Sequence, residues 1–187
     1  PVPLPLDVEI GPPNGWAAFA VSPGGNLVYR TDAAKSVVLS WVDEDGNEQP
    51  VVDSTARYSD AVTSPDGKKV AVVRDGDVWI YDRQRKLFSR LTQTEQRETN
   101  LLWTPNSREV LYSRDVPQYD IFRRAADGST PEERVVTSTN DKEATSISAD
   151  GKVLLYDDDK GESDDIYATS TNPSDHAAAR KIIGGPQ

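Results

Sequence analysis

The sequence contains no cysteine and no methionine, and its only histidine is His176. Without cysteine, neither disulfides nor thiolate chemistry is available, and this absence does not indicate a cellular compartment. A serine–histidine–aspartate triad needs a buried, oriented histidine, and zinc needs several cysteine or histidine ligands. His176 instead lies in a polar stretch after Pro173. We therefore expect that the protein is not an enzyme and that it carries no cofactor.

Positive charge is scarce as well. The chain has 21 lysines and arginines against 31 aspartates and glutamates, which gives a formal net charge of −10. A protein this acidic is repelled by phosphate backbones unless it has a local basic patch, and none is evident, so we expect no nucleic-acid partner. No apolar run approaches the roughly 18 residues that span a bilayer, so we expect no direct membrane insertion.

A four-residue turn pattern recurs along the chain. The tetrads are Ser22-Pro23-Gly24-Gly25, Ser64-Pro65-Asp66-Gly67, Thr104-Pro105-Asn106-Ser107 and Ser148-Ala149-Asp150-Gly151. Proline presets φ for a turn, aspartate or asparagine can bond the local backbone, and glycine accepts a positive φ. Successive tetrads start 42, 40 and 44 residues apart. A period near 40–45 residues with four short strands per unit is typical of β-propeller blades.

The apolar runs that follow the tetrads support this architecture. Residues 70–73, 110–112 and 153–156 are continuously apolar, which indicates strands that are covered on both faces, as between stacked blades. Asp77, Asp120 and Asp165 each open the next strand, and we expect them to satisfy turn N–H groups. We predict an all-β protein, a β-propeller of about four four-stranded antiparallel blades. It forms one repeat domain over residues 1–187, with repeats at about 16–52, 58–92, 98–137 and 143–183.

The first ten residues are predicted to form an extra outer strand. Prolines at positions 1, 3 and 5 lack an N–H group, so only Val2, Leu4 and Leu6 can donate hydrogen bonds, and only to one edge. An extended polyproline-like tail is the alternative. Four blades of four strands already make up a closed ring, so this additional strand has no place in it. We therefore expect protein association, either with another protein or between two chains. The ring would then be completed by a second chain or belong to a larger propeller.

The repeated pattern of Ser-Pro-Asp-Gly followed by Asp-Ile-Tyr resembles the WD-like repeats of TolB-type β-propellers, from Trp16 to Ile183. Residues 19–23, 27–29 and 41–46 are similar to a narrower group, the C-terminal propeller of bacterial eukaryote-like serine/threonine kinases. This resemblance implies that the chain is the later part of a larger propeller and that it lies in the periplasm or elsewhere outside the cytoplasm. No kinase motif is present, so phosphoryl transfer is not implied.

Two groups of residues are candidate sites. Carboxylates of the kind that bind Ca²⁺ are concentrated in one stretch, namely Asp157, Asp158, Asp159, Glu162, Asp164 and Asp165. The stretch lacks the spacing of an EF-hand loop, and a solvated hairpin is the alternative. Trp16 follows a break rich in glycine and proline, so we expect it to be exposed and to join Val2, Leu4 and Leu6 in an interaction surface. The other three tryptophans are expected to pack between blades.

Three functions remain open. The first is a non-catalytic propeller module for protein interaction or ligand sensing. The second is a structural module that oligomerises through open blade edges. The third is an accessory propeller of an enzyme such as a peptidase or a kinase. The fold is compatible with all three functions, so it does not choose between them.

Overall fold

The computed structural model describes residues 10–11, 16–17, 19–21, 27–29, 36–52, 54–136, 139–159, 164–172 and 179–183. Side chains are described from residue 36 onward, with the exception of Asp164. The predicted outer strand over residues 1–10, including Val2, Leu4 and Leu6, lies outside this part except for Ile10. The chain divides between Gln93 and Thr94 into two compact units.

The described residues form strands and turns and no helix. The strands are β1 (Ile10–Gly11), β2 (Trp16–Ala17), β3 (Phe19–Val21), β4 (Leu27–Tyr29), β5 (Ser40–Val42), β6 (Glu48–Pro50), β7 (Tyr58–Thr63), β8 (Lys69–Arg74), β9 (Asp77–Asp82), β10 (Leu87–Arg90), β11 (Glu98–Trp103), β12 (Glu109–Val116), β13 (Gln118–Ala125), β14 (Glu133–Val136), β15 (Asp141–Ile147), β16 (Val153–Asp159), β17 (Asp164–Ser170) and β18 (Arg180–Ile183). Accordingly, no described segment is a helix long and apolar enough to cross a membrane.

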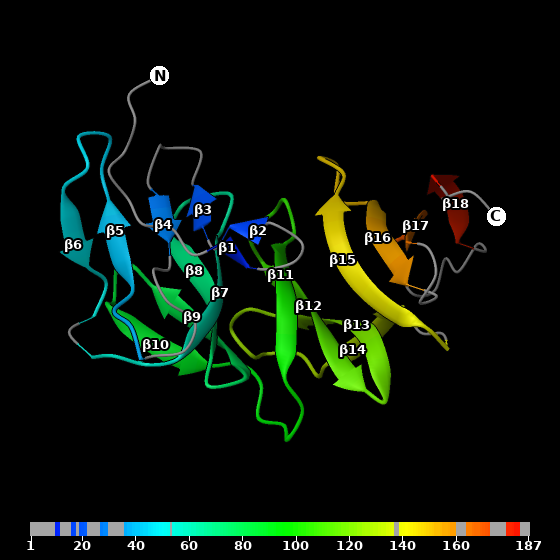
Figure 1. The fold of residues 1–187 in the computed structure, drawn as a ribbon, viewed down its shortest axis with the longest axis horizontal. Coiled ribbons are helices and arrows are strands. Elements are labelled where there is room, and N and C mark those ends of the chain that lie inside the picture. The colour runs from blue at the N-terminus through cyan, green and yellow to red at the C-terminus, as the bar shows by residue number, and fades with distance from the viewer. Residues whose placement is uncertain are drawn as a thin grey trace. The chain divides into compact units, whose positions relative to one another are not determined.

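Sixteen of these strands form four antiparallel sheets of four strands each, in which neighbours in sequence are neighbours in the sheet. The first sheet is β3–β6, the second β7–β10, the third β11–β14 and the fourth β15–β18. Figure 1 shows the second sheet in the N-terminal unit, and β15 beside the third sheet in the C-terminal unit. The prediction of an all-β chain with four four-stranded sheets is confirmed. In addition, β1 and β2 pair as a separate two-stranded sheet.

Three of the four tetrads lie in the described part of the chain, and each of these three forms the turn between the first and second strands of its sheet. In the second sheet the Ser64 hydroxyl donates to Asp66 Oδ1 (2.7 Å), and the Lys69 amide donates to Ser64 Oγ (2.9 Å). Thr104 with Asn106, and Ser148 with Asp150, make the same bonds. The side chains therefore satisfy the turn backbone from within, which explains why this residue pattern recurs.

The third tetrad has a serine where the others have glycine. Ser107 has a φ of 59°, close to the 68° of Gly67 in the equivalent turn. This left-handed conformation is unfavourable for a residue with a Cβ. We expect Ser107→Gly to raise the free energy of unfolding by about 0.5–1 kcal/mol, as measured by urea denaturation.

Gly67→Ser is the matched control for Ser107→Gly. A Cβ on Gly67 meets no atom within 4 Å, so its cost comes from the backbone conformation alone. We expect it to lower the free energy of unfolding by about 1 kcal/mol. Equal stability of both variants and the native chain would show that these turns do not favour glycine.

Each unit has its own apolar core. In the N-terminal unit, Leu39 and Val51 pack with Val70, Val72 and Tyr81 of the second sheet. In the C-terminal unit, residues of the third sheet (Leu111, Ile121, Val135 and Val136) pack against residues of the fourth (Ala144, Leu154 and Tyr156). The second strands β8 and β12 are buried on both faces, as their continuous apolar runs predicted.

The prediction that an apolar run marks a strand covered on both faces is wrong for residues 153–156 of β16. Leu154 and Tyr156 are buried, whereas Val153 is 40% exposed and Leu155 is half-buried. Side chains alternate between the two faces of a strand, and of these four residues the core shared with the third sheet contains only Leu154 and Tyr156. An apolar run therefore did not distinguish a strand covered on both faces from one covered on a single face.

Candidate functional site

An ion pair between the third and fourth strands recurs in three sheets. Asp77 pairs with Arg90, Asp120 with Arg134, and Asp165 with Lys181, the last at 2.9 Å between Nζ and Oδ2. All three aspartates are buried. The sequence predicted turn N–H partners for these carboxylates and did not predict the cations. A buried carboxylate needs such a partner, so we interpret these pairs as structural.

The third sheet contains a larger buried charge network. Arg114 donates from Nε to Glu98 Oε1 (2.8 Å) and from Nη1 to Glu132 Oε1 (2.6 Å). The Tyr112 hydroxyl also donates to Glu132. Glu98 and Tyr112 have no exposed surface, and Arg114 is 6% exposed. The guanidinium group lies 4.6 Å from the ring centroid of Phe122. Two carboxylates and an aromatic ring thus surround this arginine.

The network shifts the pKa values of its members. Burial raises the pKa of Glu132, but hydrogen bonds from Arg114 and Tyr112 outweigh it and lower that pKa overall. Burial and the hydrogen bond to Glu132 raise the pKa of the Tyr112 hydroxyl. Both groups are therefore held in their ordinary ionisation states at neutral pH, which favours a structural role over proton transfer.

The predicted metal candidates are divided between two faces of the fourth sheet. Asp158 and Asp165 lie opposite each other in β16 and β17 and are buried. Lys142 Nζ lies 3.5 Å from Asp158 Oδ1, and Lys181 pairs with Asp165. The lysines neutralise both carboxylates, so these two do not present free negative charge to a cation.

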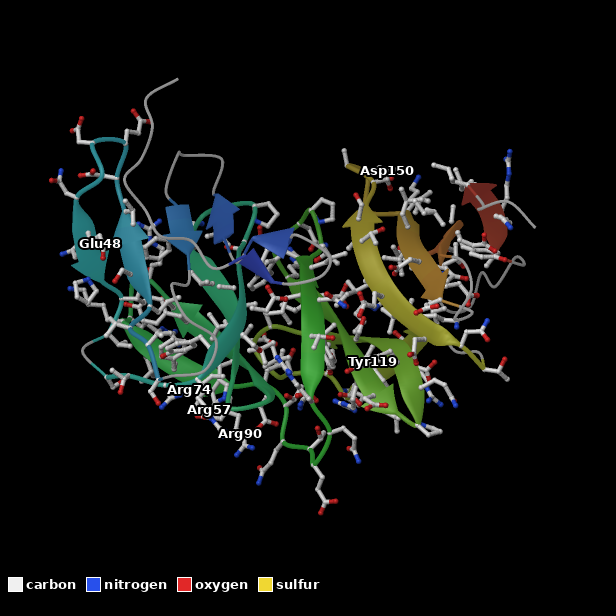
Figure 2. The ribbon with its side chains drawn as sticks, viewed as in Figure 1. Glu48, Arg57, Arg74, Arg90, Tyr119 and Asp150 are labelled. Atoms are coloured by element: carbon white, nitrogen blue, oxygen red, sulfur yellow. The ribbon has the colours of Figure 1, made fainter. Side chains whose placement is uncertain are left out.

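Asp157 and Asp159 belong to the other face, because side chains alternate along β16. There they lie opposite Glu143 and Asp141 of β15. Burial and the charge of Asp157 raise the pKa of Glu143, to which the charges of Asp141 and Asp159 also contribute. Asp141 in addition accepts a hydrogen bond from the amide of Tyr119, which is labelled in Figure 2.

Within the described part of the chain, no three acidic or histidine side chains are arranged so that they could hold a metal ion together. Glu162, His176 and the side chain of Asp164 lie outside that part, as does the side chain of Trp16. Cation binding by this acidic stretch therefore stays a prediction. Calorimetric titration with Ca²⁺ tests it, and no heat at millimolar Ca²⁺ would contradict it.

A groove of about 380 Å³ lies in the C-terminal unit, where the tetrad turns of the third and fourth sheets meet. We call it the turn groove; it is lined by Thr104, Pro105, Asn106, Glu109, Arg123, Ala149, Asp150, Gly151 and Thr171. Figure 2 labels Asp150 at the turn between β15 and β16. The sequence located these turns, but it did not show that two of them share a groove.

The turn groove contains fixed charges of both signs. Arg123 donates from Nη1 to the Thr171 carbonyl (2.9 Å) and from Nη2 to Glu133 (2.6 Å), and its Nε lies 3.7 Å from Glu109. A hydrogen bond from the Ser148 hydroxyl lowers the pKa of Asp150, which is therefore a carboxylate at neutral pH. The groove thus offers rigidly held donors and acceptors rather than a nucleophile paired with a base.

Comparisons with known proteins identify the fold. No protein-family model and no curated protein sequence matches the chain. Among solved structures, TolB from Acinetobacter baumannii is 15% identical with a TM-score of 0.70, over 83% of this chain and 41% of that one. A nidogen chain in a nidogen/laminin complex is 10% identical with a TM-score of 0.70, over 89% of this chain and 64% of that one. A prolyl endopeptidase is 21% identical with a TM-score of 0.65, over 90% of this chain and 29% of that one.

The chain is therefore a β-propeller protein by its fold. More specifically, this fold is TolB-like. The chain spans about 41% of the length of the TolB structure that it matches. At these low identities the similarity concerns the fold and not the activity. The resemblance to TolB-type repeats inferred from the tetrads is thereby confirmed at the level of the fold.

Proposed function

We propose that the chain is a non-catalytic propeller module that binds a polypeptide segment of a partner protein in the turn groove. The observation that carries this proposal is the mixed charge of the groove, which Arg123, Glu109 and Asp150 all line. A peptide backbone presents both donors and acceptors and can match such a surface. A nucleic acid would meet two carboxylates on a chain of net charge −10.

The way in which Arg123 is held supports binding over catalysis. Its guanidinium group donates to Glu133 and to the Thr171 carbonyl and lies near Glu109, so its charge is balanced within the fold and little of it is left to stabilise a developing negative charge. Rigid polar groups are suited to selecting a partner, because they lose little conformational entropy when it binds. The nidogen neighbour was solved in a complex with laminin, which accords with such a role without assigning it to this chain.

Ala149→Arg tests the groove. Ala149 is exposed, lies in the lining and makes no tetrad side-chain bond, so an arginine there fills the groove and leaves the turn intact. We expect short peptides selected for binding to the native chain to bind this variant at least about tenfold more weakly, measured by fluorescence polarisation. Pro65→Arg, at the equivalent turn of the second sheet, is the matched control and should bind normally. Equal binding by both variants would overturn the proposal.

We infer further that the chain acts as the C-terminal propeller of a bacterial eukaryote-like serine/threonine kinase, outside the cytoplasm. The support is the similarity of residues 19–23, 27–29 and 41–46 to that group of propellers. An accessory propeller of a peptidase is the alternative, which the prolyl endopeptidase neighbour keeps open. The full-length gene decides between them, because a kinase domain and a hydrolase domain are readily recognised in sequence.

Self-association is a second candidate function, favoured by the open face of the fourth sheet. Val153 is 40% exposed, and Ile183, which lies opposite Ile166, is 60% exposed. Exposed apolar surface of this kind favours burial against another chain. We expect light scattering at tens of micromolar to detect dimers, and a monomer at that concentration would contradict this role.

A further inference from the structure

Two arginines occupy equivalent positions in the second and third sheets. Arg74 lies opposite Tyr58 on one side and Asp77 on the other, and Arg114 lies in the same way between Glu98 and Asp120. Both stack on an aromatic ring of the third strand. Arg74 is 5.0 Å from the Trp79 ring centroid, and Arg114 is 4.6 Å from that of Phe122. The two sites therefore share one scaffold.

The two sites differ in the carboxylates that surround the arginine. Arg114 donates hydrogen bonds to both Glu98 and Glu132. In the second sheet, Tyr58 takes the place of Glu98. Phe88 takes the place of Glu132, because each stands two residues before the fourth-strand arginine, Arg90 or Arg134, that pairs with the buried aspartate. The second sheet thus has aromatic residues at the two positions where the third sheet has carboxylates, and both sheets have the arginine.

Arg74 consequently keeps hydrogen-bonding capacity. Among the residues that the structure describes, its ion-pair partner is Asp75, at 3.8 Å from Nε, which is longer than a hydrogen bond. Its guanidinium group makes no hydrogen bond to any residue that the structure describes, and lies over the rings of Trp79 and Phe88. The side chain is 27% exposed, so a ligand can reach it.

Further positive charge surrounds Arg74. Arg90 lies 5.8 Å from the Trp79 ring centroid on the same sheet, and Arg57 bonds Asp75 at 3.1 Å. Figure 2 shows these three arginines gathered at one end of the second sheet. In the ion pairs formed here by described residues, three guanidinium groups meet two carboxylates, Asp75 and Asp77, an excess of one positive charge on a strongly acidic chain.

We propose that Arg74, flanked by Arg90 and Trp79, binds a carboxylate of a partner polypeptide. The guanidinium fork matches a planar carboxylate bidentately, and stacking on Trp79 keeps the fork oriented. Glu132 at Arg114 shows the interaction that the shared scaffold supports. A single excess positive charge suits a monoanion better than a phosphate dianion. The site shares no residue with the turn groove, so the test of this proposal is independent of the test of the groove.

NMR titration of the chain with short blocked peptides tests this proposal. We expect a peptide with two glutamates to shift two signals, the Trp79 indole N–H and the Arg74 Nε–H, and the shifts to saturate at peptide concentrations up to about 10 mM. The same peptide with glutamines in place of the glutamates should leave both signals unchanged. A peptide without acidic side chains but with a free C-terminus reveals whether a terminal carboxylate also binds. Binding of either carboxylate source supports the proposal.

Arg74→Gln should weaken binding by about tenfold or more, because it removes charge-assisted hydrogen bonds. Arg85→Gln is the matched control, since it removes the same charge from an exposed turn of the same sheet, and its affinity should stay within about twofold. Phe88→Glu supplies the internal carboxylate found in the third sheet and should also abolish binding. Thermal unfolding of each variant shows that it is folded.

Four results would overturn the proposal. They are the absence of any shift, equal binding of the glutamine peptide, equal weakening by Arg74→Gln and Arg85→Gln, and tighter binding of a phosphoserine peptide than of the glutamate peptide. The first two exclude a carboxylate ligand, the third shows only general attraction of charge, and the fourth indicates a phosphate site.

Discussion

Replacing Arg114 with methionine is expected to lower the free energy of unfolding by about 3–5 kcal/mol. Glu98 has no exposed surface, and Arg114 is its ion-pair partner, with Nε 2.8 Å from Glu98 Oε1. Without the guanidinium group, this buried carboxylate must either stay charged, away from water and without that cation, or take up a proton at neutral pH. Methionine preserves much of the side-chain volume, so the loss reflects charge rather than a cavity. Urea denaturation followed by circular dichroism measures the loss.

Arg74→Met is the matched control for Arg114→Met. Arg74 occupies the equivalent position and stacks on Trp79, but it pairs with no buried carboxylate. We expect its replacement to cost only about 0.5–1 kcal/mol, the worth of a partly exposed cation–π contact. Similar losses in the two variants would show that the stack, and not the carboxylates, makes Arg114 important.

The same network should contribute to acid sensitivity. The pKa of Glu132 is lowered in the folded chain, so its contribution to stability is present above the unfolded-state pKa and is lost as the pH falls through the folded value. In Arg114→Met, Glu132 no longer has this cation, and its part of the pH dependence should shrink. A steeper fall in stability with acid in the variant would contradict this account.

The second large effect is expected at Leu154. It has no exposed surface and packs in the core of the C-terminal unit with Leu111 and Ile121. We expect Leu154→Ala to lower the free energy of unfolding by about 2–5 kcal/mol, because it removes buried methyl groups and leaves a cavity. The adjacent Val153 points to the other face and is 40% exposed, so Val153→Ala should cost less than about 1 kcal/mol.

This pair also tests which face of the fourth sheet is covered. The two residues are neighbours in one strand and in one apolar run, so intrinsic strand propensity hardly separates them. If Val153→Ala costs as much as Leu154→Ala, both faces are covered in solution. Another chain would then cover the open face, which light scattering under the same conditions would detect.

Much of the architecture could be predicted because its signals are local. Each tetrad that the structure describes closes its turn through bonds between residues two to five positions apart, as between Ser64 and Asp66 or Lys69. Such bonds depend on the residues of the turn alone, so their sequence pattern reveals them wherever it recurs. The four four-stranded sheets follow from the period between these turns.

The candidate sites could be predicted only in part. The acidic stretch was recognised, but its division between two faces follows from the pairing of β15, β16 and β17 and from the partners Lys142 and Lys181. The turn groove was missed, because Arg123 and the Thr171 carbonyl that it contacts are 48 residues apart. The contrast between Arg74 and Arg114 became visible only when the strand register aligned the two sheets.

By itself, the sequence determined that the chain is all-β, that it repeats four times and where its turns fall, because these depend on short-range bonds and on alternation along a strand. The tertiary structure alone decided which face of β16 is covered, which cation meets each buried carboxylate and which arginine keeps free donors. Those outcomes depend on distant residues, such as Glu98 and Glu132 around Arg114, that only folding brings within hydrogen-bonding distance.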